Sequence, residues 1–148
     1  MKTIFDKATK DELIIRINSL NENSIAQWGK MNVYQVLKHC RLWDEWIQNS
    51  KNNRQAFIGR LFGKIALKKV FKDESPLTRN TPTLPEFKIK ETTGDIKSEQ
   101  NKWITLIKGY DHFSSPIFLH TFFGKMTKEQ VGKMVYKHAD HHLRQFGV

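Results

Sequence analysis

The stretch TKEQVGKMVYKHADHHLRQFG, residues 127–147, decides the fold of this 148-residue chain. It opens with Thr127-Lys128-Glu129-Gln130, a capping box whose side chains satisfy the first free backbone amides of a helix. It closes at Gly147, a residue type favoured just after a helix ends. Between these ends, apolar residues and two histidines recur at steps of three and four and so share one face: Val131, Met134, Val135, His138, His142 and Phe146. The pattern predicts a helix packed into a core.

The two histidines on that face predict a metal site. His138 and His142 stand where a core helix would carry Leu or Val, and their i, i+4 spacing presents two imidazoles side by side. His39 lies on the apolar face of an earlier predicted helix and can supply a third nitrogen. Three histidines would leave the fourth position of a tetrahedral ion open, as catalytic zinc sites do. The competing interpretation is three core histidines that hydrogen-bond to neighbours and hold no ion.

Three further helices complete the expected core. The first covers residues 9–20 and begins at a capping box, Thr9-Lys10-Asp11-Glu12. The second, capped by Asn32, carries Val33, Val36, Leu37, Cys40, Trp43 and Ile47 on one face. Another fits residues 95–110. Together with the last helix they predict an all-α four-helix bundle, with residues 1–148 forming a single domain.

The remaining segments are harder to interpret. Residues 55–72 predict an amphipathic basic helix, and residues 73–95 read as a long proline-containing loop, either a functional lid or rim or an ornament. Residues 112–126 form a non-periodic apolar connector, so any β-structure is expected only within residues 73–95. Asp140 and His141 fall off the inward face and are expected at the rim of the site at most. His120 either borders the pocket mouth or, like His112, lies at the surface.

Composition limits the compartment and the partners. The formal net charge is +10, which favours polyanions, anionic membrane surfaces or small acidic ligands, unless the lysines form only a solvated surface. No apolar run is long enough to cross a bilayer, and the N-terminal residues do not resemble a signal peptide. Cys40 is the only cysteine, so no intrachain disulfide is expected, and the protein is expected in the cytoplasm. Cys40 itself is interpreted as core packing.

Three segments carry a resemblance to a known superfamily. KHADHHLRQFG (residues 137–147), WGKM (residues 28–31) and the H-x-x-FG-x-M connector (residues 120–126) resemble the DinB/YfiT-like proteins, in a branch known as a domain of unknown function. The resemblance implies an up-down-down-up bundle, with a long crossover between the second and third helices. It also implies a metal on His39, His138 and His142. Better-studied members are metal-dependent thiol-transferases or isomerise maleylpyruvate, and related proteins often dimerise, which leaves a homodimer open.

The leading hypothesis is a metal-dependent thiol-S-transferase. In this interpretation Zn or Ni on the three histidines activates a low-molecular-weight thiol, which serves as co-substrate towards an electrophile. The second hypothesis is a hydrolase that uses metal-bound water. The third is a non-catalytic basic binding module, in which residues 60–72 lie on nucleic acid or on an anionic membrane. The leading hypothesis expects neither a specific nucleic acid nor a membrane as partner.

Overall fold

The computed structural model describes residues 1–49 and 54–148. Its helices are α1 (Lys7–Ser19), α2 (Val33–Asn49), α3 (Phe57–Val70), α4 (Ile96–Gly109) and α5 (Lys128–Gln145). Short 3-10 helices η1 (Pro85–Phe87) and η2 (Tyr110–His112) and the strands β1 (Ile117–His120) and β2 (Gly124–Thr127) complete the order. Among these described helices, none has the length and apolar character that crossing a bilayer requires.

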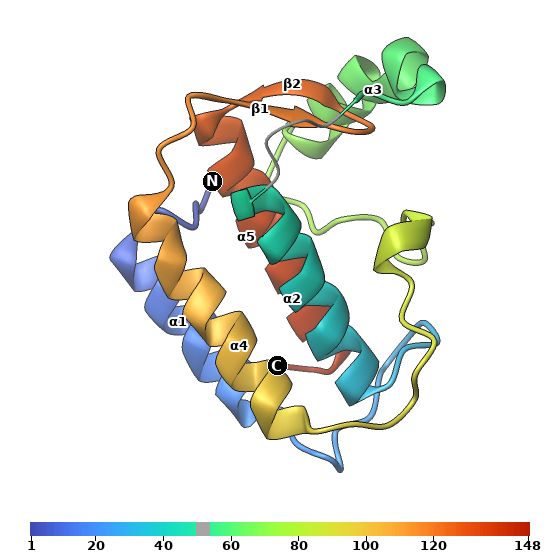
Figure 1. The fold of residues 1–148 in the computed structure, drawn as a ribbon, viewed down its shortest axis with the longest axis vertical. Coiled ribbons are helices and arrows are strands. Elements are labelled where there is room, and N and C mark those ends of the chain that lie inside the picture. The colour runs from blue at the N-terminus through green and yellow to red at the C-terminus, as the bar shows by residue number, and fades with distance from the viewer. Residues whose placement is uncertain (50–53) are drawn as a thin grey trace.

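Four of the helices form the predicted bundle. α1 packs on α4 and α5, and α2 packs on the same two helices, so the four close around one core. Figure 1 shows that α2 and α4 run in one direction and that α1 and α5 run in the other. The chain between α2 and α4 therefore crosses the length of the bundle, as the expected long crossover does. The predicted inward faces of α2 and α5 are buried, including Val36, Leu37, Val131 and Val135.

The helix ends follow the sequence in all but one case. Thr127 and Gln130 make the reciprocal capping box, Asn32 Oδ1 accepts from the Gln35 amide, and Gly147 adopts a left-handed φ of +77°. The capping box predicted at Thr9 is wrong. α1 already begins at Lys7, because the carbonyl oxygen of Asp6 accepts from the Lys10 amide and closes the first turn two residues earlier. Thr9 is consequently a buried residue inside the helix.

A buried carboxyl group joins α2 to α4. Asp44 accepts hydrogen bonds from the Trp103 indole at 2.7 Å and from the Tyr110 hydroxyl at 2.6 Å. Burial raises the pKa of Asp44 to about 7 against the opposing effect of these two donors. The contact sets the distance between the helix that carries His39 and its neighbour in the bundle.

The expectation that β-structure would be confined to residues 73–95 is wrong. β1 and β2 pair as an antiparallel hairpin, with Phe118 opposite Met126 and His120 opposite Gly124. Phe118 and Met126 point into the core, while Ile117 is exposed. A four-residue strand with apolar residues on both faces shows no alternation in its sequence, which explains why the segment reads as an irregular connector.

Residues 55–72 form a helix as predicted, but this helix lies outside the bundle. In Figure 1, α3 projects beyond the end of the bundle, next to the hairpin. It packs on β2 and on the hairpin turn, and only Gly59, Gly63 and Leu67 of the helix are buried. Five other large apolar residues of the helix are exposed: Phe57, Ile58, Leu61, Phe62 and Ile65.

Candidate metal centre

The three predicted histidines meet in space. His39 comes from the middle of α2, and His138 and His142 come from successive turns of α5. One nitrogen of each lies within 4.8 Å of the others. His39 and His142 are buried, whereas His138 is only half-buried. The cluster is thus held inside the bundle with one member open towards solvent.

Two hydrogen bonds select the ring nitrogens that face the centre. His39 Nδ1 lies 2.9 Å from the carbonyl oxygen of Phe87. Because a carbonyl only accepts, His39 carries its proton on Nδ1 and leaves the Nε2 lone pair free. His142 Nδ1 lies 3.0 Å from Gln145 Oε1 in the same way. Partners of this kind hold metal-binding imidazoles in the required tautomer and orientation.

A relay of contacts fixes the amide of Gln145. Its Nε2 donates to the carbonyl oxygen of Trp28 at 2.8 Å, so Oε1 is the atom that must face His142. The backbone amide of Gln27 donates to the Gln145 carbonyl at 2.7 Å. Gln27 and Trp28, the second of which begins the WGKM segment, therefore support the ligand geometry from outside the helix.

His138 completes the cluster and fits the size of a metal site. Its Nε2 lies 3.2 Å from His39 Nε2. Two ligands at a metal–nitrogen distance of about 2.0–2.1 Å in a tetrahedral site are about 3.3–3.4 Å apart. With the His39 proton on Nδ1, a hydrogen bond between these two atoms is donated by Nε2–H of neutral His138. A shift of that proton to Nδ1 would present three Nε2 lone pairs. The Trp43 ring stacks on His138 with centroids 4.2 Å apart and limits its rotation.

The electrostatic environment keeps the imidazoles neutral. Burial lowers the pKa of His39, and it lowers the pKa of His138 and of His142 well below the ordinary value. The neighbouring histidines act in the same direction because two imidazolium ions would repel each other. Metal ligation requires neutral imidazole, so the donor set suits a divalent ion.

The other candidate residues lie outside the cluster. Asp140 is buried and joins α5 to α1: Arg144 Nε donates to Oδ2 at 2.7 Å, and Arg16 lies 2.9 Å from Oδ1 as an ion pair outside hydrogen-bonding geometry. His112 is exposed, as expected. Cys40 is fully buried, and burial raises the pKa of its thiol well above the ordinary value, which agrees with a packing role.

His120 has a structural role that its sequence position did not reveal. It is 6% exposed, and its Nδ1 accepts hydrogen bonds from the backbone amides of Phe122 at 3.0 Å and Phe123 at 3.3 Å. Its ring also contacts Trp46 of α2. His120 therefore holds the hairpin turn closed against the bundle, and it is not a surface residue.

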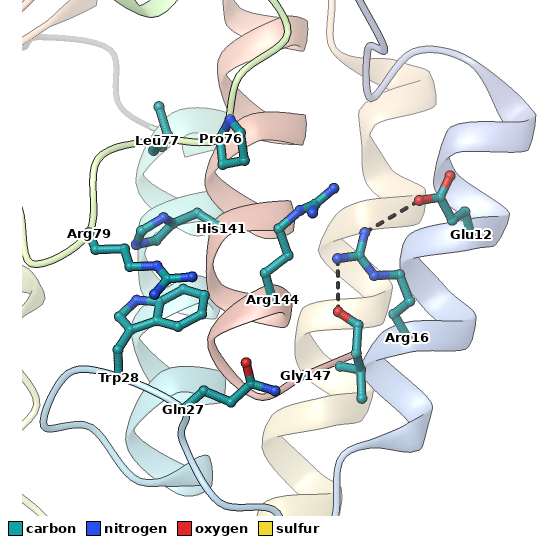
Figure 2. A pocket seen from close by; sticks show the side chains of 11 residues that line it. Glu12, Arg16, Gln27, Trp28, Pro76, Leu77, Arg79, His141, Arg144 and Gly147 are labelled. Carbon is teal, nitrogen blue, oxygen red and sulfur yellow. Dashed lines mark hydrogen bonds and ion pairs between the residues drawn. The ribbon is translucent and has the colours of Figure 1, made fainter.

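A cleft of about 560 Å³ lies beside α5 (Figure 2), and its lining does not include the three clustered histidines. Its lining includes Arg16, Arg144, Arg79, Trp28 and His141. The Arg79 guanidinium lies 3.9 Å from the centre of the Trp28 ring, and the His141 ring is 5.0 Å from that of His142. His141 therefore lies between His142 and a cleft whose lining includes three arginines.

The long loop contributes to both features. Phe87, in η1, is buried and supplies the carbonyl group that orients His39, while Pro76, Leu77 and Arg79 line the cleft. The loop therefore positions one of the three histidines and lines the cleft, and its role as a functional rim stays a prediction. Sequence reasoning missed Phe87 and Gln145. Gln145 could have been identified from the sequence, because it lies one turn after His142 on the same helix.

Comparisons with known proteins place this chain only at the level of a family. No curated protein and no solved structure matches the chain. One family model, described as "Protein of unknown function (DUF1569)", matches residues 5–147. That match covers both helices that supply the histidines, and the chain belongs to this family of proteins of unknown function.

Proposed function

We propose that this chain is a metal-dependent enzyme of the DinB type that transfers a low-molecular-weight thiol to an electrophile. The observation that carries the proposal is the convergence of His39, His138 and His142, with the tautomers of two of them set by separate hydrogen bonds. A structural zinc site normally has four protein ligands, whereas three favour a centre with an open position. The up-down-down-up course of the four bundle helices supports the DinB resemblance.

The residues of the chain have distinct parts in this proposal. His39, His138 and His142 would hold zinc or nickel, since imidazole suits both ions. Such an ion lowers the pKa of a thiol that binds to it, so that the thiol is ionised at neutral pH. Phe87 and Gln145 hold two of the rings in place, and half-buried His138 marks the side from which a substrate can approach. The reacting sulfur belongs to the co-substrate, because the Cys40 thiol is fully buried.

The cleft suggests an acidic substrate or thiol. Arg79 forms no ion pair with any described residue, and Arg144 uses Nε for Asp140 while its side chain stays 54% exposed. These guanidinium groups provide the planar pairs of donors that bind carboxylates. We assign the carboxylate of the thiol or of its acceptor to this cleft, and we place the reaction in the cytoplasm, where thiols stay reduced.

The first test is metal content per chain after dialysis against excess zinc or nickel. His39→Ala, His138→Ala and His142→Ala should each abolish tight binding, because two remaining ligands hold an ion much more weakly than three. His112→Ala and His141→Ala are the matched controls and should bind as the parent does. A parent that takes up no ion, or a His39 variant that binds as tightly as the parent, excludes the three-histidine site.

The second test is the requirement for thiol. The zinc- or nickel-loaded protein is mixed with glutathione or bacillithiol and a bimane halide. The thiol sulfur forms a bond to carbon, halide leaves, and the thiol proton goes to solvent. Fluorescent thioether should form faster than without protein, and Arg79→Ala should raise KM without changing the metal content. Turnover of ester or amide substrates without any thiol would instead identify the hydrolase.

A further inference from the structure

The outer face of α3 is the largest apolar feature on the described surface. Five large side chains of this one helix are 56–75% exposed: Phe57, Ile58, Leu61, Phe62 and Ile65. At about 100° per residue they share one arc of about 140°. The other exposed large apolar residues, such as Ile15 and Ile25, are isolated on other elements. Contiguous apolar surface of this kind marks an interaction site.

The helix is mounted so that this face points outward. Gly59 and Gly63 lie against the backbone of Phe122 in the hairpin turn, where a Cβ on either glycine would collide with the Phe122 carbonyl oxygen. At the other end, the ammonium group of Lys137 donates to the carbonyl oxygens of Val70, Asp73 and Ser75 at 2.7–2.9 Å. The two glycines and the contacts of Lys137 thus hold α3 on the protein, and the five large apolar residues of its outer face stay uncovered.

The charges around the face specify the partner. Residues 54–72 contain no acidic residue and six basic ones: Arg54, Arg60, Lys64, Lys68, Lys69 and Lys72. All six are exposed, and none forms an ion pair with a described acidic group. On the helical wheel, Arg60 and Lys64 lie just outside one edge of the apolar arc, and Lys68 and Lys69 lie just inside its two edges. A second copy would bring two such basic helices together, and like charges oppose that pairing.

We propose that α3 docks on an anionic lipid surface, with its apolar face among the acyl chains and its basic residues among the headgroups. Interfacial helices combine these features, because apolar burial and attraction to anionic lipid add together. Lysine side chains at the edge of the arc can extend their ammonium groups to the headgroups while their stems stay in apolar surroundings. From the sequence, packing on the bundle explains the apolar residues of this segment equally well. Leu67 does pack on the core, but the five residues of the outer face are exposed.

The experiment is flotation of the full chain with vesicles. One set contains phosphatidylcholine alone, and the other is an equimolar mixture of phosphatidylcholine and phosphatidylglycerol. The chain should float only with the mixed vesicles, and added salt should weaken the binding. Phe62→Ser combined with Ile65→Ser should weaken it about tenfold or more, because two large apolar groups no longer enter the lipid. Lys64→Glu combined with Lys68→Glu should also weaken it.

Matched controls lie in the connector between α1 and α2, at the opposite end of the bundle from α3 (Figure 1). Ile25→Ser removes an 83% exposed apolar side chain, and Lys30→Glu reverses an exposed charge. Both should bind vesicles as the parent does, and thermal unfolding verifies that every variant folds. The proposal is overturned by parent protein that does not float with mixed vesicles, or by equal losses in the controls. A second contrary result is light scattering that shows the parent to be a dimer, which only the α3 variants dissociate. A third is parent protein that binds duplex DNA and does not bind vesicles.

Discussion

α5 and α3 are both amphipathic helices in sequence, yet the protein uses them in opposite ways. α5 directs its apolar face into the bundle, where Leu143 is fully buried and His138 and His142 meet His39. α3 directs its apolar face outward, and Leu61 is 56% exposed. The periodicity of a helix shows which residues share a face, but it does not show what covers that face.

The difference lies in how each helix is attached. α5 contacts its neighbours through large side chains, so its apolar residues are buried in the core. α3 contacts the hairpin through Gly59 and Gly63, which permit a close backbone approach and contribute little apolar area. Four predictions test this contrast, and they are ordered from the largest expected effect to the smallest.

Leu143→Ala should destabilise the protein by about 2–5 kcal/mol, since a fully buried leucine is replaced by a cavity in the core. Urea unfolding of the parent and the variant measures the free energy. A loss below about 1 kcal/mol would mean that α5 is packed no better than a surface helix, and the contrast with α3 would fail.

Acid should destabilise the hairpin that carries α3. Burial lowers the pKa of His120 to about 4, from an ordinary value of about 6.5. The unfolded chain therefore binds a proton first. The contribution of His120 to stability should fall as pH drops below about 6.5 and level off below about 4, a change on the order of 3 kcal/mol. His39, His138 and His142 add to the loss in acid, because burial lowers their pKa values as well.

The variant His120→Asn isolates this contribution. Its amide oxygen can replace Nδ1 as acceptor for the turn amides, but it does not titrate. Unfolding measured with chelator present should depend less on pH between 7 and about 4 in this variant. Exposed His112→Asn is the control and should keep the full dependence. Identical profiles for the parent and His120→Asn would contradict the role given to His120.

Gln145→Met should weaken zinc binding about 10–100-fold, as loss of a hydrogen bond to a ligand typically does. Gln145→Glu should largely retain binding, because its carboxylate still accepts the Nδ1 proton of His142. Zinc titration against a competing chelator distinguishes the two. If both variants lose binding equally, the contact to Trp28 matters more than the contact to His142.

Leu61→Ala should change the free energy of unfolding by no more than about 0.5 kcal/mol. It makes the same chemical change as Leu143→Ala on a residue whose side chain is already 56% exposed. The same urea unfolding measures both. A loss comparable to that of Leu143→Ala would show that α3 is covered in solution by a second copy of the chain.

Prediction from sequence succeeded where the signal is local. The inward positions of His39, His138 and His142 followed from helical spacing, and the cap at Thr127 followed from four adjacent residues. It failed at Thr9, because the hydrogen bond from the Lys10 amide to the Asp6 carbonyl begins α1 two residues earlier. It also failed at residues 117–127, where strands of four residues are too short to show their period. Whether the cluster binds an ion stays a prediction.

The sequence by itself determined which segments are helices, which residues share their faces, and that three histidines point inward, because these properties repeat every few residues along the chain. Only the tertiary structure decided which histidine nitrogens face the centre. The carbonyl of Phe87, 48 residues from His39, selects Nε2 of His39. The Gln145 amide that selects the nitrogen of His142 is itself oriented by the distant carbonyl of Trp28. The tertiary structure likewise decided that the outer face of α3 stays uncovered, because α3 is attached through a hairpin turn at Phe122, far along the chain from Gly63. Contacts between distant residues have no local period, and so no window of sequence reveals them.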